Sequence, residues 1–238
     1  MAARAGSSLT IRCLTFDLDD TLWDAGSIIV RAEVAAFEWL EHHAPEVVAG
    51  RTADELAAHR RAFYSSLPHL SHDFTALRRA WLAHLFAAAG LGRRRSEQAF
   101  MAFWRVRNEV APFPEAIAAL ERLRRRFVLG TVTNGNASID YIGLAKYFAF
   151  TVTAGEAGVM KPDPGIFAFA LAKAGIKPSE AVHIGDDPDA DMRGAMNHGM
   201  RAVWVNPHGH RWDRIHGAPP HAQIGGLGEL DEVLEAWR

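Results

Sequence analysis

Two groups of acidic residues follow short apolar runs of the sequence, where carboxylates could carry out chemistry. Asp17 and Asp19 come directly after the apolar residues 9–16, and Asp186, Asp187 and Asp191 follow residues 181–184. Several carboxylates in one small site repel one another unless a cation neutralises them, and an all-oxygen ligand set favours a hard ion such as Mg²⁺. The pattern therefore predicts a magnesium site if the two groups meet in the folded chain.

Two further apolar runs are followed by polar side chains that suit an anionic ligand. Thr133 and Asn134 stand at the end of residues 127–133, and Lys161 follows residues 150–153. Hydroxyl, amide and ammonium groups all donate hydrogen bonds to phosphate oxygens. Taken singly, each motif also has an ordinary structural explanation, such as a helix cap, a turn or a surface lysine.

The elements that would position these residues alternate along the chain. Strand-length apolar runs occupy residues 9–16, 127–133, 150–153, 181–184 and 202–205, and helical stretches are expected over residues 114–126, 137–147, 164–174 and 188–198. This alternation predicts an α/β fold with a parallel sheet covered on both faces. Ligands bind beyond the carboxyl ends of such strands, so the polar groups are expected to converge at one edge.

Residues 28–110 differ in composition from the rest of the chain. They contain no run of β-forming residues and are dominated by alanine, leucine and arginine. Apolar residues recur there at helical spacing, which predicts an inserted bundle of about four helices. We therefore expect a core domain made of residues 1–24 and 111–238, and a helical cap domain made of residues 25–110.

Composition limits the classes of partner. The 238 residues carry a formal net charge of −2, so there is no electrostatic case for nucleic acid or an anionic membrane as the main partner. A single cysteine, Cys13, excludes an internal disulfide, and no apolar run approaches the ~18–20 residues of a membrane span. We expect a cytoplasmic protein that acts on a small molecule; the sequence does not indicate its oligomeric state.

Taken together, the motifs resemble the four ordered motifs of the haloacid dehalogenase superfamily of hydrolases. They are Asp17-Leu18-Asp19-Asp20-Thr21, Thr133-Asn134-Gly135, Lys161-Pro162-Asp163-Pro164, and Gly185-Asp186-Asp187 with Asp191. Four motifs in order are far more specific than any one of them. The resemblance implies a Rossmann-like, three-layer core with a type 1 helical cap over the active site.

The resemblance also implies a role for each motif residue. Asp17 matches the nucleophile that forms an aspartyl phosphate, and Asp19 matches the general acid and base. The implied Mg²⁺ ligands are the side chains of Asp17 and Asp186 and the backbone carbonyl of Asp19. The implied phosphate-binding residues are Leu18, Thr133, Asn134 and Lys161, with Lys161 also balancing charge beside Asp17. Asp187 and Asp191 are expected to orient the ligands.

Asp19 separates the reactions of this superfamily. Dehalogenases generally lack an aspartate at its position, so its presence favours hydrolysis or transfer of phosphate. A phosphonatase would need a cap lysine, and residues 28–110 contain none. A phosphomutase remains an alternative, as do two proteins of other classes: a phosphoacceptor signalling domain and a catalytically silent scaffold.

The substrate is expected to be a small phosphate ester. Residues 14–24, 133–137 and 183–187 look most like bacterial phosphatases that act on FMN or on the phosphoribitylaminouracil of riboflavin synthesis, whereas residues 155–158 match the generic superfamily pattern better. A broad-specificity nucleotide or sugar phosphate phosphatase is the alternative. His72 and Arg78 are candidate substrate contacts in the cap. Trp23 is either a platform for an aromatic ring or an apolar plug between core and cap.

Overall fold

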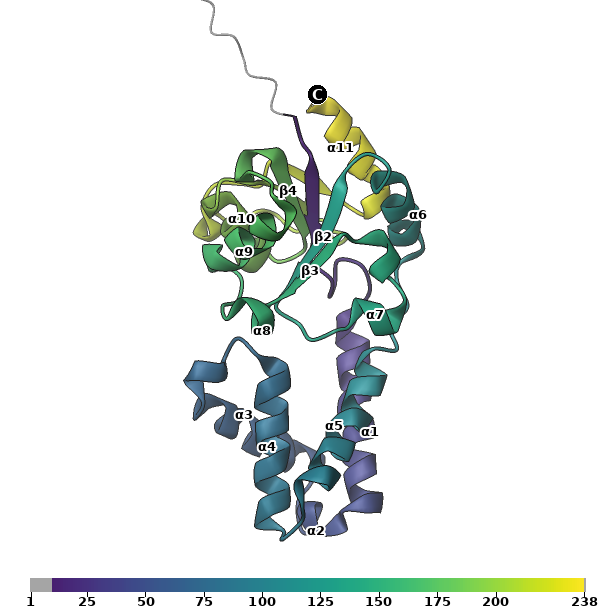
Figure 1. Ribbon diagram of the computed structural model, residues 1–238, viewed down its shortest axis with the longest axis vertical. Helices are drawn as coiled ribbons and strands as arrows, with labels where there is room; N and C mark the ends of the chain where they lie inside the picture. The colour runs from purple at the N-terminus through teal and green to yellow at the C-terminus, as the bar shows by residue number, and fades with distance from the viewer. Residues whose placement is uncertain (1–9, 238) are drawn as a thin grey trace, which may run out of the picture.

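Strand β1 (Cys13–Phe16) lies near the middle of a six-stranded sheet in the computed structural model, which describes residues 10–237 (Figure 1). All neighbouring strands are parallel, and their order is β3-β2-β1-β4-β5-β6. The other strands are β2 (Val128–Thr133), β3 (Phe150–Thr153), β4 (Ala181–Gly185), β5 (Arg201–Val205) and β6 (Ala222–Ile224). Since β1 pairs with both β2 and β4, the loop that follows it emerges at the centre of the carboxyl edge.

Helices cover both faces of this sheet, as the predicted three-layer α/β fold requires. One face packs against α6 (Pro114–Leu123), α7 (Ile139–Ile142) and α11 (Leu230–Ala236), and the other against α9 (Pro164–Ala174) and α10 (Gly194–Asn197) (Figure 1). A short helix, α8 (Ala154–Ala157), follows β3. Alternate residues of one strand serve the two cores: Leu14 belongs to the first and Cys13 to the second.

The structure differs from the expected elements in several places. Of the strand expected over residues 9–16, only Cys13–Phe16 forms, and residue 9 lies outside the described residues. The helix expected over residues 137–147 is α7 followed by a 3₁₀ turn (Ala145–Tyr147), because Gly143 adopts a left-handed conformation that ends α7. The stretch expected over residues 188–198 begins as a π-helix (Pro188–Arg193) and continues as α10. Strand β6 was not predicted, since its three residues lack the length of a recognisable apolar run.

The insert between β1 and β2 is helical throughout its regular structure. Its long helices are α1 (Ala25–His43), α3 (Ala53–Ser65), α4 (Phe74–Ala88) and α5 (Arg93–Arg107), with a short α2 (Pro45–Val48) between the first two. They share a core of their own, centred on Trp81, Phe86 and Phe100. Side chains cap three of these helices: Asp24 at α1, Thr52 at α3 and Asp73 at α4. We refer to this insert, residues 25–110, as the cap.

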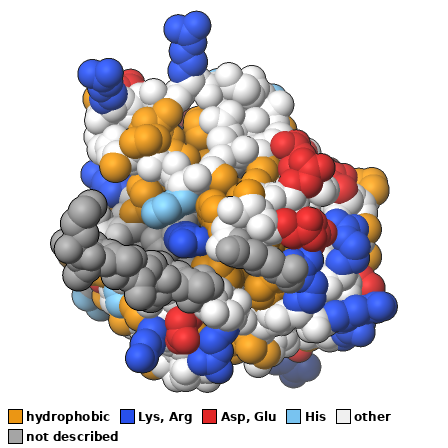
Figure 2. All heavy atoms as spheres, turned by 90° about the horizontal axis from the view of Figure 1, so that it is seen from above, with side chains coloured by type: hydrophobic (Ala, Val, Ile, Leu, Met, Phe, Trp, Pro, Cys, Tyr) orange, Lys and Arg blue, Asp and Glu red, His pale blue; other side chains and the backbone are white. Residues whose placement is uncertain are grey.

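The end of the molecule remote from the cap carries no single dominant charge. Figure 2 shows that end, where basic and acidic side chains are interspersed and the hydrophobic ones are scattered. Within residues 10–237, no helix has both the length and the apolar character that a membrane crossing requires. The mixed surface charges agree with the formal net charge of −2.

Candidate active site

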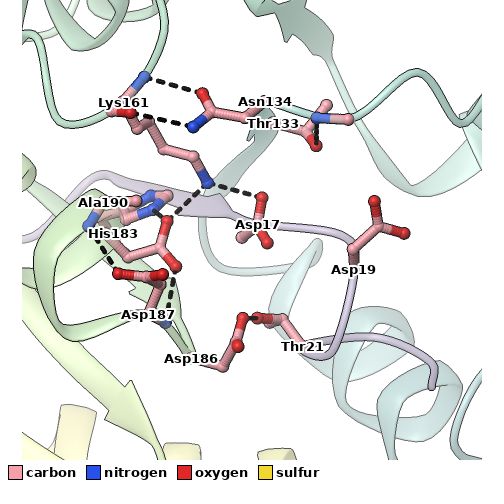
Figure 3. Close-up of polar contacts among 12 residues, drawn as sticks. Asp17, Asp19, Thr21, Thr133, Asn134, Lys161, His183, Asp186, Asp187 and Ala190 are labelled. Carbon is pink, nitrogen blue, oxygen red and sulfur yellow. Dashed lines mark hydrogen bonds and ion pairs between the residues drawn. The ribbon is translucent and has the colours of Figure 1, made fainter. Parts of the chain in front are cut away.

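Lys161 joins two of the predicted motifs at the centre of the carboxyl edge of the sheet. Its Nζ donates to Asp17 Oδ1 at 2.6 Å and to Asp191 Oδ1 at 2.5 Å, and the residue is only 4% exposed (Figure 3). Burial acts to lower the pKa of Lys161, but the two carboxylates outweigh it and raise that pKa above its usual value. Lys161 is therefore a fixed positive charge beside Asp17.

Asp191 is the anchor of this buried network. Its Oδ1 also accepts from His183 Nε2 at 2.9 Å, and its Oδ2 accepts from the backbone N–H of Asp187 at 3.0 Å. Burial would raise the pKa of Asp191, but Lys161 and His183 hold it below the usual range. Because burial lowers the pKa of His183, its ring is neutral, donating from Nε2 while Nδ1 accepts from the Thr15 hydroxyl at 2.9 Å.

The chain can place Asp191 here because Gly185 has no side chain. A Cβ at Gly185 would lie 2.3 Å from Asp191 Cγ, which is closer than real contacts allow. Asp187 acts locally instead: its Oδ1 caps the π-helix by accepting from the N–H groups of Asp189 and Ala190 at 2.8 and 2.7 Å. The fourth motif therefore brings Asp191 inward and keeps Asp187 at the helix start.

Asp17 and Asp186 are the carboxylates with room for a cation. Ligand atoms of Asp17, Asp186 and Asp191 all lie within 4.8 Å of one another. Burial raises the pKa of Asp17 well above its usual range despite the opposing charge of Lys161, and burial together with the charge of Asp191 raises that of Asp186 to about 7. The protein thus disfavours the ionised form of both carboxylates. A hard divalent cation bound between them would stabilise that form.

The remaining contacts define which oxygens such a cation would use. Both oxygens of Asp191 are already hydrogen-bonded, so it is better suited to holding Lys161 than to binding metal. Asp186 Oδ1 accepts from the Thr21 hydroxyl at 3.1 Å, which orients that carboxylate toward the site (Figure 3). The residues present thus fit Mg²⁺ with Asp17 and Asp186 as side-chain ligands.

Asp19 is positioned by two residues that sequence reasoning either missed or interpreted differently. Arg107, the last residue of α5, donates from Nη2 to Asp19 Oδ2 at 2.5 Å, and Trp23 Nε1 donates to Asp19 Oδ1 at 2.9 Å. Trp23 is fully buried, so it does not offer a face to a ligand as the stacking hypothesis requires. It is a packed plug with one polar contact, which is the second of the two interpretations considered.

The second motif holds the loops as well as facing the ligand. Thr133 Oγ1 accepts from the backbone N–H of Gly135 at 2.9 Å. The Asn134 side chain clamps the backbone of Lys161, donating to its carbonyl at 2.9 Å and accepting from its N–H at 2.7 Å. Within residues 10–237, the backbone N–H groups of Leu18 and Asn134 donate to no protein acceptor, and Asn134 lines the pocket described next.

These residues line a pocket of about 360 Å³ between the core and the cap. Its core wall includes the catalytic candidates, and its cap wall consists of Ile29, Glu33, Tyr64, Phe74, Arg78, Phe103 and Arg107. Arg78 lies over the Phe103 ring at 3.4 Å and donates to both carboxylate oxygens of Glu33. Arg78 is thus at the pocket, where it is held by Glu33, a carboxylate that also accepts from Arg60.

His72 lies elsewhere. It lines a separate hollow of about 240 Å³ where the start of α4 meets the core, together with Asp73, Asn136 and Gly155. There the Asn136 side chain donates to Thr75 Oγ1 at 3.4 Å, which links cap and core directly. The two cap candidates are therefore not brought together, and only Arg78 borders the main pocket.

Comparison with known proteins agrees with this geometry. A family model described as haloacid dehalogenase-like hydrolase matches residues 11–199. The chain is 31% identical over 232 residues to a 5-amino-6-(5-phospho-D-ribitylamino)uracil phosphatase of Escherichia coli (strain K12), covering 94% of this chain and 96% of the relative. It is 32% identical over 211 residues to the glyceraldehyde 3-phosphate phosphatase of Methanopyrus kandleri, covering 82% and 84%. Among solved structures, one described as a 2-haloacid dehalogenase from Pseudomonas syringae pv. Tomato DC3000 superimposes with a TM-score of 0.90 at 41% identity, covering 96% of this chain and all of that one.

Proposed function

The chain belongs to the haloacid dehalogenase-like hydrolases, and from that membership we propose that it is a Mg²⁺-dependent phosphomonoester hydrolase that works through an aspartyl-phosphate intermediate. The observation that carries the proposal is the convergence of Asp17, Asp19 and Lys161 on one pocket. The two phosphatases from Escherichia coli and Methanopyrus kandleri, which align with 94% and 82% of the chain, support the same reaction class.

The residues divide the reaction into two displacements. In the first, a carboxylate oxygen of Asp17 forms a bond to phosphorus while the bond to the leaving oxygen breaks, and protonated Asp19 gives its proton to that oxygen. In the second, Asp19 takes a proton from water as the water oxygen attacks phosphorus and the bond to Asp17 breaks. Inorganic phosphate leaves, and both carboxylates regain their starting states.

Charge balance explains the surrounding groups. An anionic carboxylate must approach an anionic phosphate, and Lys161 offsets part of that repulsion from its fixed position beside Asp17. When bound, Mg²⁺ would supply the remaining positive charge and polarise the phosphoryl oxygens, with Asp17, Asp186 and the backbone carbonyl of Asp19 as its protein ligands. The free N–H groups of Leu18 and Asn134, together with Thr133, would hold the phosphate oxygens.

For the substrate, we propose a small phosphorylated metabolite, with FMN or a ribityl phosphate of riboflavin synthesis as the first candidate. The support is the similarity to the ribitylaminouracil phosphatase over nearly the full length of both chains. The relative that acts on glyceraldehyde 3-phosphate makes broad specificity toward sugar and nucleotide phosphates the alternative within the same chemistry.

Dehalogenation is a second candidate because of the structural similarity to a protein described as a 2-haloacid dehalogenase. A departing halide needs no proton, however, and here Asp19 is held beside the nucleophile by two dedicated donors. That construction favours an alkoxide leaving group, which does need a proton. Halide release from 2-chloropropionate would show the alternative directly.

The proposal is tested by measuring phosphate release from p-nitrophenyl phosphate, FMN and a panel of sugar and nucleoside phosphates. We expect release with Mg²⁺, its loss in EDTA, and its loss in Asp17→Asn, with Asp54→Asn as a matched control because Asp54 is exposed in the cap. Activity that survives in Asp17→Asn would overturn the mechanism. No phosphate release from any compound, with halide release instead, would replace the function.

A further inference from the structure

Two buried polar atoms that border the active-site pocket have no partner. Among the described residues, the Tyr64 hydroxyl and Arg107 Nη1 are buried side-chain atoms without a hydrogen bond, and both residues line the pocket. Arg107 as a whole is 2% exposed and uses its other terminal nitrogen, Nη2, to hold Asp19. Most buried polar groups in proteins are paired, so two that lack a protein partner at a single pocket are candidates for binding a ligand.

The two donors reach the pocket from different parts of the cap. Tyr64 lies in the last turn of α3, and Arg107 is the last residue of α5, where the chain returns to the core. Since Arg107 contacts the residue expected to protonate the leaving oxygen, its guanidinium group lies on the leaving-group side of the pocket. Tyr64 is farther into the cap, beside Glu33 and Arg78. A ligand that meets both must extend from the phosphate site into the cap.

The charges around these donors indicate what kind of group they bind. Arg107 donates to Asp19, and Arg78 donates through two hydrogen bonds to Glu33, a carboxylate that it shares with Arg60. Both arginines that line the pocket are therefore already held by a carboxylate of the protein. Burial raises the pKa of Tyr64, which keeps its hydroxyl protonated and neutral. Neutral oxygens, which can accept from the O–H and the N–H, are the complementary chemistry.

We propose that Tyr64 Oη and Arg107 Nη1 form a subsite that binds hydroxyl groups on the leaving alcohol, so that the preferred substrates are phosphate esters of polyols. This inference rests on the phosphatase function proposed above and names the substrate class of the same site. Tyr64 acts as a specificity residue, because an ester whose leaving group lacks hydroxyls leaves both donors unsatisfied in the closed pocket.

The test compares ribitol 5-phosphate with n-pentyl phosphate, which have the same five-carbon chain and differ in the hydroxyl groups. We expect the ratio of their kcat/KM values to fall about tenfold in Tyr64→Phe, the loss of about one neutral hydrogen bond. Tyr141→Phe is the matched control, since Tyr141 is 54% exposed and lies outside the pocket. Its ratio is expected to equal that of the wild type.

A second measurement guards against a merely structural role for Tyr64. An unpaired buried hydroxyl destabilises the protein when no ligand is bound. Tyr64→Phe is therefore expected to raise the midpoint of thermal unfolding by about 2–4 °C, while it lowers the ratio of the two kcat/KM values. An unchanged ratio overturns the subsite. The analogue 5-phosphonooxypentanoate ends in a carboxylate instead of hydroxyl groups. A kcat/KM for this analogue that is higher than that for ribitol 5-phosphate, and that falls below it in Tyr64→Phe, would overturn the assignment to hydroxyls. Failure to hydrolyse even p-nitrophenyl phosphate is a different result, because it removes the proposed function itself.

Discussion

Substitution of Gly135 by alanine should displace the general acid while leaving the fold intact. A Cβ built at Gly135 lies 2.4 Å from Asp19 Oδ2, whereas ordinary contacts begin at 3.4 Å. Asp19 is held from its other sides by Arg107 and Trp23, so the carboxylate must move by about 1 Å, and a misplacement of that size costs on the order of 100-fold in rate. The backbone of Gly135 is not in the left-handed region, so the local penalty is steric; besides the clash with Asp19, the added Cβ would lie 3.3 Å from Arg107 Nη2 and from Thr133 Oγ1.

The assay compares kcat/KM on n-pentyl phosphate and on p-nitrophenyl phosphate. Pentoxide needs a proton in order to leave and nitrophenolate does not, so Gly135→Ala should lose about 100-fold on the first ester and much less on the second. Gly228→Ala is the control, because a Cβ there meets nothing within 4 Å. If Gly135→Ala hydrolyses pentyl phosphate at the wild-type rate with an unchanged unfolding midpoint, the assignment of Asp19 as general acid is refuted.

Two further substitutions test the charge networks. Lys161→Met leaves Asp17 and Asp191 buried without their cation, and we expect it to lower the free energy of unfolding by about 3–5 kcal/mol in urea at pH 7; a stability equal to that of the wild type would show that the network contributes nothing. Glu33→Gln should cost about 2 kcal/mol at pH 7, because it removes the carboxylate that accepts from two cap arginines. Burial would raise the pKa of Glu33, but those arginines hold it below its usual value of 4.5, so the stabilisation is complete above pH 4.5 and is lost as the pH falls through the lower value of the folded state. In urea titrations at decreasing pH, the free energy of unfolding of the wild type should therefore approach that of Glu33→Gln. A difference in stability that grows as the pH falls would contradict this reasoning.

The core of the site was predictable because parallel strands impose a simple geometry. Each motif follows a strand, and all strand ends of a parallel sheet face the same edge, so Asp17, Thr133 and Asp186 had to converge whatever their separation in the chain. Lys161 was expected beside Asp17 for the same reason together with the family resemblance. These expectations needed no knowledge of side-chain packing.

The cap contacts could not be predicted in this way. Arg107 is 88 residues from Asp19 and ends a helix that contains four other arginines, so nothing in the local pattern distinguishes it. Trp23 could be interpreted either as a stacking platform or as an apolar plug, and only its burial in the structure distinguishes the two. The double contact between Asn134 and Lys161 depends on how two loops approach each other, which periodicity does not encode.

The central place of β1 in the sheet has a consequence for how the protein folds. The strand that carries the nucleophile is made first, yet one of its two partners, β4, lies about 168 residues later, as the contact of Thr15 with His183 shows. During synthesis the helices of the cap emerge next and make mostly local contacts, which form quickly, whereas the closure of β1 against β4 is a long-range event. A nascent chain therefore assembles the cap before the central strand has both neighbours. Asp17 leaves the ribosome before the other strands of the sheet, yet it is positioned for catalysis only after β4 has joined β1.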